Sequence, residues 1–384
     1  AGAPRLPDAS AVMAPLTRRD PDAVRAAVRR TRGTEPGPPL TLAQAVNATL
    51  ADVLASWPQA LVFGEDVAAK GGVYGVTRGL RKRFGGQRVF DTLLDEQTVL
   101  GTALGAAVAG LLPVPEIQYL AYLHNAEDQL RGEGASLAFF SDGQYRNGMV
   151  VRIAGFAHQE GFGGHFHNDG SVAVLRDVPG LVVAVPSHPA EAPALLRACV
   201  GLAVGEGRVC VFLEPIALYH ERDLHDGDGA WLAPYEPADE DEDVVDRVAT
   251  HGTGDDLLLV TFGTGVRTSM RAAARLRERG VDCTVLDLRW LAPLPHADLL
   301  RHAGRFARVL VVDETRASGG VAEGVLAALA DAGWPGRARR VAGRDSFVPL
   351  GPAAAHVLVS EDDVVEAAAA TMDHDGRLPR RREG

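Results

Sequence analysis

The stretch LVVAVPSHPAEAPALLRACVGLAVGEGRVCVFL, residues 181–213, decides the fold. It starts with an apolar run rich in β-branched residues, Leu181–Val185, continues through an alanine-rich segment, Ala190–Val200, and ends in a second apolar run, Val209–Leu213. Near-continuous apolar strands separated by helices are typical of a parallel sheet that is covered on both faces. The stretch therefore predicts a strand, a helix and a strand of a doubly wound α/β domain.

The same alternation continues on both sides of this stretch. Upstream, the pattern predicts strands at Ala60–Phe63 and Met149–Ile153 and helices that begin after Thr41 and at Leu100–Ala109. Downstream, a second block predicts strands at Leu257–Phe262, Cys283–Asp287 and Val309–Asp313, with helices at Arg267–Arg279 and Gly320–Ala332. This second block indicates a smaller α/β domain.

The composition divides the chain into four parts. Residues 1–40 are rich in Pro, Arg and Ala and form an N-terminal arm or linker, with a short amphipathic helix near Asp20–Arg30. The first α/β domain spans 41–240, the second spans 250–374, and 375–384 form a charged tail. The acidic stretch Pro237–Asp243 marks a surface loop near the domain boundary.

Overall composition restricts the class of protein. The 384 residues are 46% hydrophobic and carry a formal net charge of −11, which argues against binding nucleic acid by bulk electrostatics. No apolar run reaches the roughly 18 residues that span a bilayer, so we expect no membrane segment. Three cysteines without CxxC spacing favour a reducing compartment, the cytoplasm.

Glu96 is the first candidate for chemistry. It lies in the segment DTLLDEQ, residues 91–97, just before a small-residue helix, Gly101–Gly110. Its apolar neighbours predict a poorly hydrated carboxylate, which must find a hydrogen-bonding partner or stay protonated; these neighbours are Leu93, Leu94, Val99 and Leu100. The alternative is an acidic residue that the dipole of a helix N-terminus favours.

Two further segments carry polar groups in suggestive places. His165-Phe-His167-Asn-Asp169 follows a glycine-rich run, and it is compatible with a polar loop, a metal site or general acid–base chemistry. The run Glu116–Tyr122 places an amide and two aromatic rings at the end of a strand, where ligands of open α/β sheets bind. Ordinary aromatic packing is the alternative there.

Two glycine motifs are interpreted as turns. Gly263-Thr-Gly265 follows a strand and opens a helix, but it lacks the third glycine of a dinucleotide fingerprint. The diphosphate and magnesium motif of thiamine enzymes requires an Asn some two dozen residues after Gly-Asp-Gly. No Asn lies within residues 230–260, after Gly227-Asp-Gly229. We therefore predict plain turns at both places.

The order of several short blocks resembles one family. These blocks are Phe63-Gly-Glu-Asp-Val67, Gly71-Gly-Val-Tyr74, Gly79-Leu80, Phe84-Gly85, Arg88-Val-Phe-Asp-Thr92, Glu96-Gln97, Glu116-Ile-Gln118 and Asp128-Gln129. Together they resemble the β subunit of the thiamine-dependent 2-oxoacid dehydrogenase E1 component, the branched-chain type most closely. The resemblance covers about residues 40–375.

The resemblance implies a pyrimidine-binding domain followed by a transketolase C-terminal-type domain, and it assigns roles to four residues. Glu96 matches the carboxylate that hydrogen-bonds N1′ of the cofactor's aminopyrimidine. Tyr122 matches the aromatic residue beside that ring, and Gln118 lies in the same wall. His167 matches the family's active-site histidine. It is followed by Asn168-Asp169 where the family usually has Ser-Gln, and that departure bears on substrate preference.

The resemblance also implies a set of partners. Thiamine diphosphate would lie at an interface with an E1 α-type subunit or domain, in an assembly of two α and two β subunits. The partner would hold the diphosphate and Mg²⁺, so no metal ligand is assigned to this chain. The substrate would be a branched-chain 2-oxoacid or pyruvate, and the acyl group would pass to a lipoyl group of E2.

Alternatives remain open at this point. An acetoin dehydrogenase β subunit or another transketolase-group thiamine enzyme, such as the C-terminal portion of a deoxyxylulose-phosphate synthase, shares this layout. A non-catalytic paralogue would keep the fold without the chemistry. Residues 1–40, upstream of the resemblance, are compatible with the remnant of a linker in a fused α–β chain.

Overall fold

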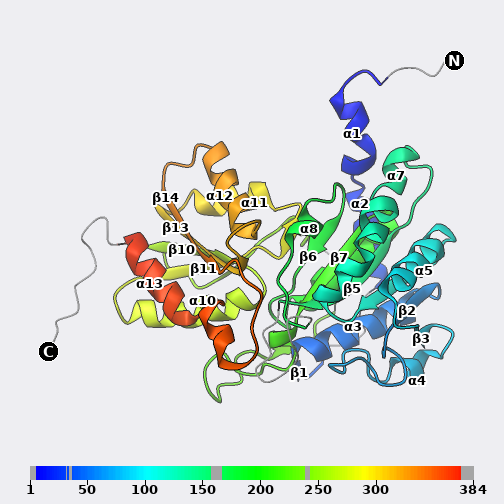
Figure 1. Cartoon of the computed structure of the whole chain (residues 1–384), viewed down its shortest axis with the longest axis horizontal. Helices are drawn as coiled ribbons and strands as arrows, with labels where there is room; N and C mark the ends of the chain where they lie inside the picture. The colour runs from blue at the N-terminus through cyan, green and yellow to red at the C-terminus, as the bar shows by residue number, and fades with distance from the viewer. Residues whose placement is uncertain (1–5, 32, 34–36, 157–166, 238–242, 373–384) are drawn as a thin grey trace.

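The computed structural model describes residues 6–31, 33, 37–156, 167–237 and 243–372. Two sheets with helices on both sides lie next to each other, the first on the right of Figure 1 and the second on the left. The acidic residues 238–242 and the tail from residue 373 onward lie outside the described residues.

The first sheet has the strand order β12-β6-β7-β5-β4-β2-β3. Its strands are β2 (Ala60–Gly64), β3 (Val89–Asp91), β4 (Leu112–Ile117), β5 (Met149–Gly155), β6 (Val182–Ala184), β7 (Val209–Pro215) and β12 (Trp290–Ala292). Neighbouring strands are parallel, except that β12 runs antiparallel to β6. The predicted parallel sheet is confirmed. The sequence did not predict that β12, from the second domain, extends it.

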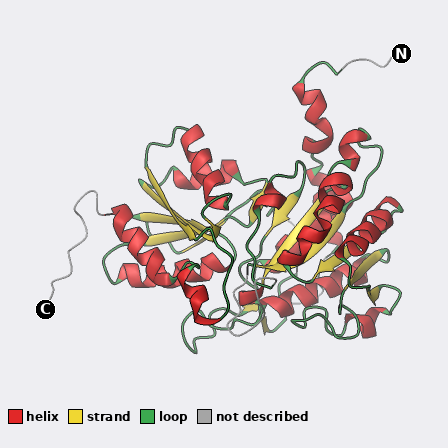
Figure 2. Ribbon diagram, viewed as in Figure 1, coloured by secondary structure: helices red, strands yellow, loops and turns green. Residues whose placement is uncertain are grey.

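Helices cover both faces of this sheet, as Figure 2 shows. One face packs against α2 (Pro21–Arg30), α3 (Leu42–Ser56) and α9 (Ala192–Glu206), and the other against α5 (Glu96–Val108), η2 (Gln129–Gly134) and α8 (Ala173–Arg176). Consecutive strand residues alternate between the faces: Val150 joins the first hydrophobic cluster and Val151 the second. Shorter elements are α4 (Leu80–Phe84), α6 (Leu120–Leu123), η1 (His124–Ala126), α7 (Leu137–Phe140) and η3 (Ile216–Leu218).

The start of α3 has a clear local cause. The Thr41 hydroxyl accepts a hydrogen bond from the backbone N–H of Gln44, and the Gln44 side chain accepts one from the backbone N–H of Thr41 at 2.9 Å. This capping box satisfies two backbone donors that the first turn leaves without partners.

The second domain contains a five-stranded sheet, with the order β14-β13-β10-β11-β9. Its elements are β9 (Ala249–His251), β10 (Leu257–Thr261), α10 (Thr264–Arg277), β11 (Cys283–Asp287), α11 (His296–Ala303), β13 (Arg308–Arg316), α12 (Val321–Asp331), β14 (Arg337–Gly343), η4 (Gly351–His356) and α13 (Glu361–Met372). Only β9, at the edge, is antiparallel to its neighbour within the described residues. Each of the two hydrophobic clusters includes residues of both domains.

The N-terminal arm packs onto the first domain. It contains α1 (Ala9–Thr17) and α2, and the latter confirms the helix predicted near Asp20–Arg30. Val24 is buried against α9, where a Cβ added at Gly201 would lie 3.0 Å from Val24 Cγ1 and one at Gly205 2.9 Å from Val24 N. The two glycines therefore let α2 approach α9 closely. Beyond the arm, β1 (Pro39–Leu40) pairs with β8 (Ala233–Pro234).

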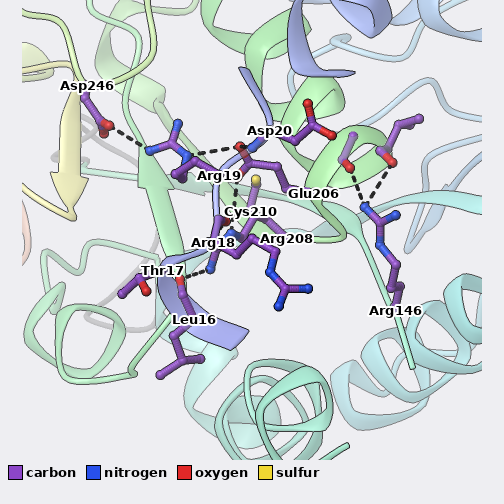
Figure 3. A network of polar contacts seen from close by, with 12 residues as sticks. Leu16, Thr17, Arg18, Arg19, Asp20, Arg146, Glu206, Arg208, Cys210 and Asp246 are labelled. Atoms are coloured by element: carbon purple, nitrogen blue, oxygen red, sulfur yellow. Dashed lines mark hydrogen bonds and ion pairs between the residues drawn. The ribbon is translucent and has the colours of Figure 1, made fainter. Parts of the chain in front are cut away.

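A polar network attaches the end of α1 and the short segment between α1 and α2 to the rest of the chain (Figure 3). Arg19 forms ion pairs with Glu206 at 3.0 Å and with Asp246 at 2.9 Å. Arg208 donates to the carbonyl oxygens of Leu16 and, at 2.8 Å, Arg18. The arm is thus bound at the end of α9 and at Asp246, near the start of the second domain.

Both predicted glycine turns are confirmed. Gly263 precedes α10 with a φ of 53°, and Gly227 and Gly229 have φ values of 77° and 63°. The Asp228 carboxylate accepts hydrogen bonds from the backbone N–H groups of Leu224, His225 and Ala230. It closes its own loop in this way, as Asp does in turns.

Candidate active site

The candidate residues lie at the carboxyl edge of the first sheet. β2 ends at Gly64, β4 ends just before Gln118, and β5 ends at Gly155, twelve residues before His167. Glu96 begins α5, which follows β3. Because the carboxyl ends of parallel strands meet at one edge, the fold brings these segments to the same side of the domain.

Glu96 lies at the open side of this edge. The side chain of Asp95 caps α5 by accepting from Thr98 N at 3.3 Å, and Glu96 takes the first helical position. The Glu96 carboxylate accepts a hydrogen bond from Asn125 Nδ2 at 3.1 Å. Glu96 is half-buried, whereas Leu93 and Leu94 are 77% and 70% exposed. The predicted poorly hydrated setting is therefore wrong for this chain alone: Val99 and Leu100 are buried, but the two leucines before Glu96 face outward.

Tyr122 and His167 are brought together. Tyr122 Oη and His167 Nε2 are hydrogen-bonded at 3.1 Å, and the rings of Tyr119 and His167 meet edge-on with centroids 4.6 Å apart. Tyr119 Oη in turn lies 3.1 Å from Tyr74 Oη. Burial raises the pKa of Tyr122, so its hydroxyl keeps its proton near neutral pH.

Glu96 is electrostatically coupled to this aromatic group. Its charge contributes to the raised pKa of Tyr122, after burial and the influence of Tyr119 and Glu65. Burial, followed by the charges of Asp66 and Glu96, also raises the pKa of Glu65. Gln118 is half-buried, directly after β4 at the same edge. The hydrogen-bond partner of Glu96 is Asn125, three residues after Tyr122 in the chain.

A buried ionic network lies behind the site, and it was not predicted. Arg152 of β5 donates to both carboxylate oxygens of Glu214 on β7, at 2.7 and 2.8 Å, and to Glu116 of β4 at 2.6 Å. The Tyr219 hydroxyl donates to Glu214 at 2.5 Å. Burial works to lower the pKa of Arg152, but the two glutamates outweigh it and raise that pKa. The sequence signal for the Arg152–Glu214 pair is one charged residue of opposite sign inside each of the otherwise apolar strands β5 and β7.

Asp169, two residues after His167, is held on both sides. It lies 3.2 Å from His124 Nε2, accepts a hydrogen bond from Ser171 at 2.7 Å and pairs with Arg316 at 3.0 Å. Burial works to raise the pKa of Asp169, but these partners outweigh it and lower that pKa to about 2. His165, which the metal interpretation of this motif requires, lies outside the described residues.

A second group of ionisable side chains joins the two domains. Ligand atoms of Glu191, His251 and Asp287 lie within 4.8 Å of one another, a spacing at which a metal ion can be held. Glu191, however, already pairs with Arg289 at 3.2 Å, and Ser187 donates to Asp287. These contacts satisfy the two carboxylates within the protein, so the group is accounted for as an ionic contact between domains.

In the described part of the chain, no helix combines the length and the apolar character that crossing a bilayer requires.

Comparison with known proteins agrees with this architecture. Residues 39–220 match the pyrimidine binding domain of transketolase, and residues 246–364 match the transketolase C-terminal domain. A pyruvate dehydrogenase E1 component subunit beta from Staphylococcus epidermidis is 32% identical over 339 residues, covering 87% of this chain and 99% of the relative. The protein of that name from Staphylococcus aureus is 31% identical over 341 residues, with the same coverage of 87% and 99%.

A solved structure shares the fold. It is described as a split gene transketolase, an inactive β4 tetramer, and it matches with a TM-score of 0.68 at 19% identity over 87% of this chain and 99% of its own. At that identity the likeness concerns the fold alone.

Proposed function

Because this chain belongs to the family of 2-oxoacid dehydrogenase E1 β subunits, with transketolase pyrimidine-binding and C-terminal domains, we propose that it contributes half of a thiamine diphosphate site. The reaction is decarboxylation of a 2-oxoacid, followed by acyl transfer to a lipoyl group of E2. The names of its relatives make pyruvate the first substrate to test, ahead of the branched-chain acids that the sequence resemblance favoured.

Glu96 carries the proposal, because the residues around it suit an aminopyrimidine. The cofactor supplies an electron sink for the loss of CO₂. The Glu96 carboxylate accepts one hydrogen bond from Asn125, which leaves it lone pairs for a proton shared with N1′ of the pyrimidine. Tyr122 and Gln118 form the adjoining wall. His167, bonded to Tyr122, exchanges a proton during acyl transfer.

An α-type partner fits the open side of this site. Leu93 and Leu94 are exposed beside Glu96, and a Cβ placed on Gly101 or Gly105 of α5 would meet nothing within 4 Å. Such a surface suits close packing against another chain. Asp228 of the Gly-Asp-Gly motif is used by its own loop, so we assign the diphosphate and Mg²⁺ to the partner, in an assembly of two α and two β subunits. The three buried, free cysteines support a cytoplasmic location.

The test is Glu96→Gln in the complex with the α-type partner. Gln keeps the size of the side chain but removes the charge, and we expect decarboxylation to slow by about 30- to 1000-fold, the loss of about 2–4 kcal/mol typical of one preorganised polar group. Pyruvate, branched-chain 2-oxoacids and acetoin are compared as substrates, and Glu133→Gln, at an exposed glutamate, is the control. Normal decarboxylation by Glu96→Gln would refute the proposed role of Glu96. Absence of decarboxylation by the wild-type complex would favour a non-catalytic paralogue. Turnover of acetoin alone would favour an acetoin dehydrogenase.

A further inference from the structure

The segment that carries His167 is fixed by a residue of the second domain. Arg316, at the end of β13, pairs through Nη2 with Asp169 Oδ1 at 3.0 Å and donates through Nη1 to Ser171 Oγ at 2.5 Å. Ser171 Oγ donates to the same Asp169 oxygen at 2.7 Å. The three side chains form a closed triangle across the domain boundary, beginning two residues after His167.

Arg316 is itself held in place within its own domain. Its Nε donates to the carbonyl oxygen of Ser346 at 3.1 Å, which leaves the other two nitrogens directed at the first domain. The pairing of β13 with β14 shifts register between Asp313 and Arg316, and irregularities of this kind re-aim a side chain. The guanidinium is therefore oriented before it meets Asp169, and little side-chain freedom is lost in the contact.

Asp169 is suited to act as the receiving anchor. Its side chain is 10% exposed, and its other oxygen, Oδ2, faces His124 Nε2 at 3.2 Å. Asp169 therefore joins η1, the His167 segment and β13.

We propose that Arg316 is a positioning residue that acts through Asp169 and Ser171 to set the place of the His167 imidazole. This inference rests on the proposed function, because it gives His167 a role in acyl transfer. The ring contacts Tyr119 and Tyr122 on one side, and the chain after it is held by Arg316 on the other. Misplacement of a catalytic group by about 1 Å costs up to about 100-fold in rate.

The experiment separates the two half-reactions of the complex assembled with the α-type partner. Decarboxylation is followed with an artificial electron acceptor, and acyl transfer with an isolated lipoyl domain. We expect Arg316→Ala to slow lipoyl acylation by about 10- to 100-fold in kcat, with KM for the oxoacid and the artificial-acceptor rate nearly unchanged. Arg316→Lys keeps the positive charge but loses the planar guanidinium that makes two hydrogen bonds at once. Its acylation rate should therefore lie between those of Arg316→Ala and the wild type.

Arg176 provides the matched control. Its side chain also bridges the domains, donating to the carbonyl oxygens of Leu291 at 3.2 Å and Gly320 at 2.9 Å, and within the described residues it has no hydrogen bond to His167, Asp169 or Ser171. If Arg176→Ala lowered acylation as much as Arg316→Ala, the role of Arg316 would be a general clamp between domains and the proposal would be wrong. If Arg316→Ala does not fold, Arg316→Lys and Asp169→Asn carry the same comparison.

A double-mutant cycle with His167→Ala decides whether Arg316 acts through the imidazole. In the His167→Ala background, Arg316→Ala should cost nothing further. An additional loss of the same size, or normal acylation by His167→Ala, would overturn the positioning role. That failure is distinct from failure of the proposed function, which only Glu96→Gln decides.

Discussion

Two sets of ionisable side chains, one within the strands of the first sheet and one beside its carboxyl edge, differ in how completely the chain itself supplies their hydrogen-bonding partners. Arg152 is 1% exposed, and its guanidinium donates to Glu116 and Glu214 on the two strands beside it. Glu96 is half-buried and accepts one hydrogen bond, from Asn125, beside the exposed side chain of Leu94.

The difference distinguishes residues that stabilise the sheet from residues that are available to a ligand. The Arg152 network ties together three neighbouring strands, and its charges find their partners within the domain. Glu96 keeps unused acceptor capacity beside two exposed leucines. A residue that must bind a cofactor at a subunit interface cannot be fully satisfied by its own chain, so the less complete set is the one expected to do the chemistry.

Breaking the satisfied set should produce the largest effect. Arg152→Met leaves two buried carboxylates without their cation, and we expect it to lower the free energy of unfolding by about 3–5 kcal/mol. Thermal or urea unfolding measures the loss. Arg152→Met combined with Glu214→Gln removes one uncompensated charge and should recover part of it. Unchanged stability of the single variant would show that the network contributes no more than a surface ion pair.

The sequence predicted what depends on local pattern. The strand Cys283–Asp287 has its predicted bounds, because the apolar residues Val285 and Leu286 at its centre mark a buried strand between two turns. Leu93 and Leu94 failed as predictors of burial because an apolar residue looks the same whether its own chain or a partner covers it. The contact between Arg316 and Asp169 spans 147 residues and depends on how two domains dock, which no local pattern contains.

The catalytic candidates show the same division. Tyr122 and His167 were singled out from motifs, and the structure brings them into contact across 45 residues. Arg152 escapes prediction because its apolar neighbours in Met149–Ile153 indicate a buried strand and nothing about a partner for its charge. Opposite charges in two neighbouring strands are a usable signal for a buried ion pair, since Glu116 lies directly beside Arg152 in the sheet register.

Glu314 adds a third case, because burial is the largest influence on its titration and Thr264 and Gly265 supply its hydrogen bonds. It accepts from Thr264 N at 2.7 Å, and burial raises its pKa from the usual 4.5 to about 8. A raised pKa in the folded state stabilises the protein fully below about pH 4.5, and that contribution is lost as the pH rises towards 8. We expect a slope of at most about 1.4 kcal/mol per pH unit in that range.

Glu314→Gln tests this slope directly. The amide keeps an acceptor oxygen for Thr264 and does not titrate. The stability of the variant relative to the wild type should therefore increase as the pH rises from 5 to 8. Thermal midpoints across that range measure the difference, with the exposed Glu278→Gln as the control. Parallel curves for wild type and Glu314→Gln would mean that Glu314 is not desolvated enough to matter.

The smallest expected effect on stability comes from the exposed surface beside Glu96. Leu93→Asp places a charge on a side chain that is 77% exposed in this chain, so the free energy of unfolding should barely change. If the α-type partner covers this leucine, binding loses the burial of one apolar side chain, about 1.5 kcal/mol or more, and the dissociation constant rises roughly tenfold. Titration of the two subunits measures it, with Leu350→Asp, 65% exposed on the second domain, as the matched control. Equal binding by both variants would place the partner elsewhere, and the incomplete surroundings of Glu96 would then need another explanation.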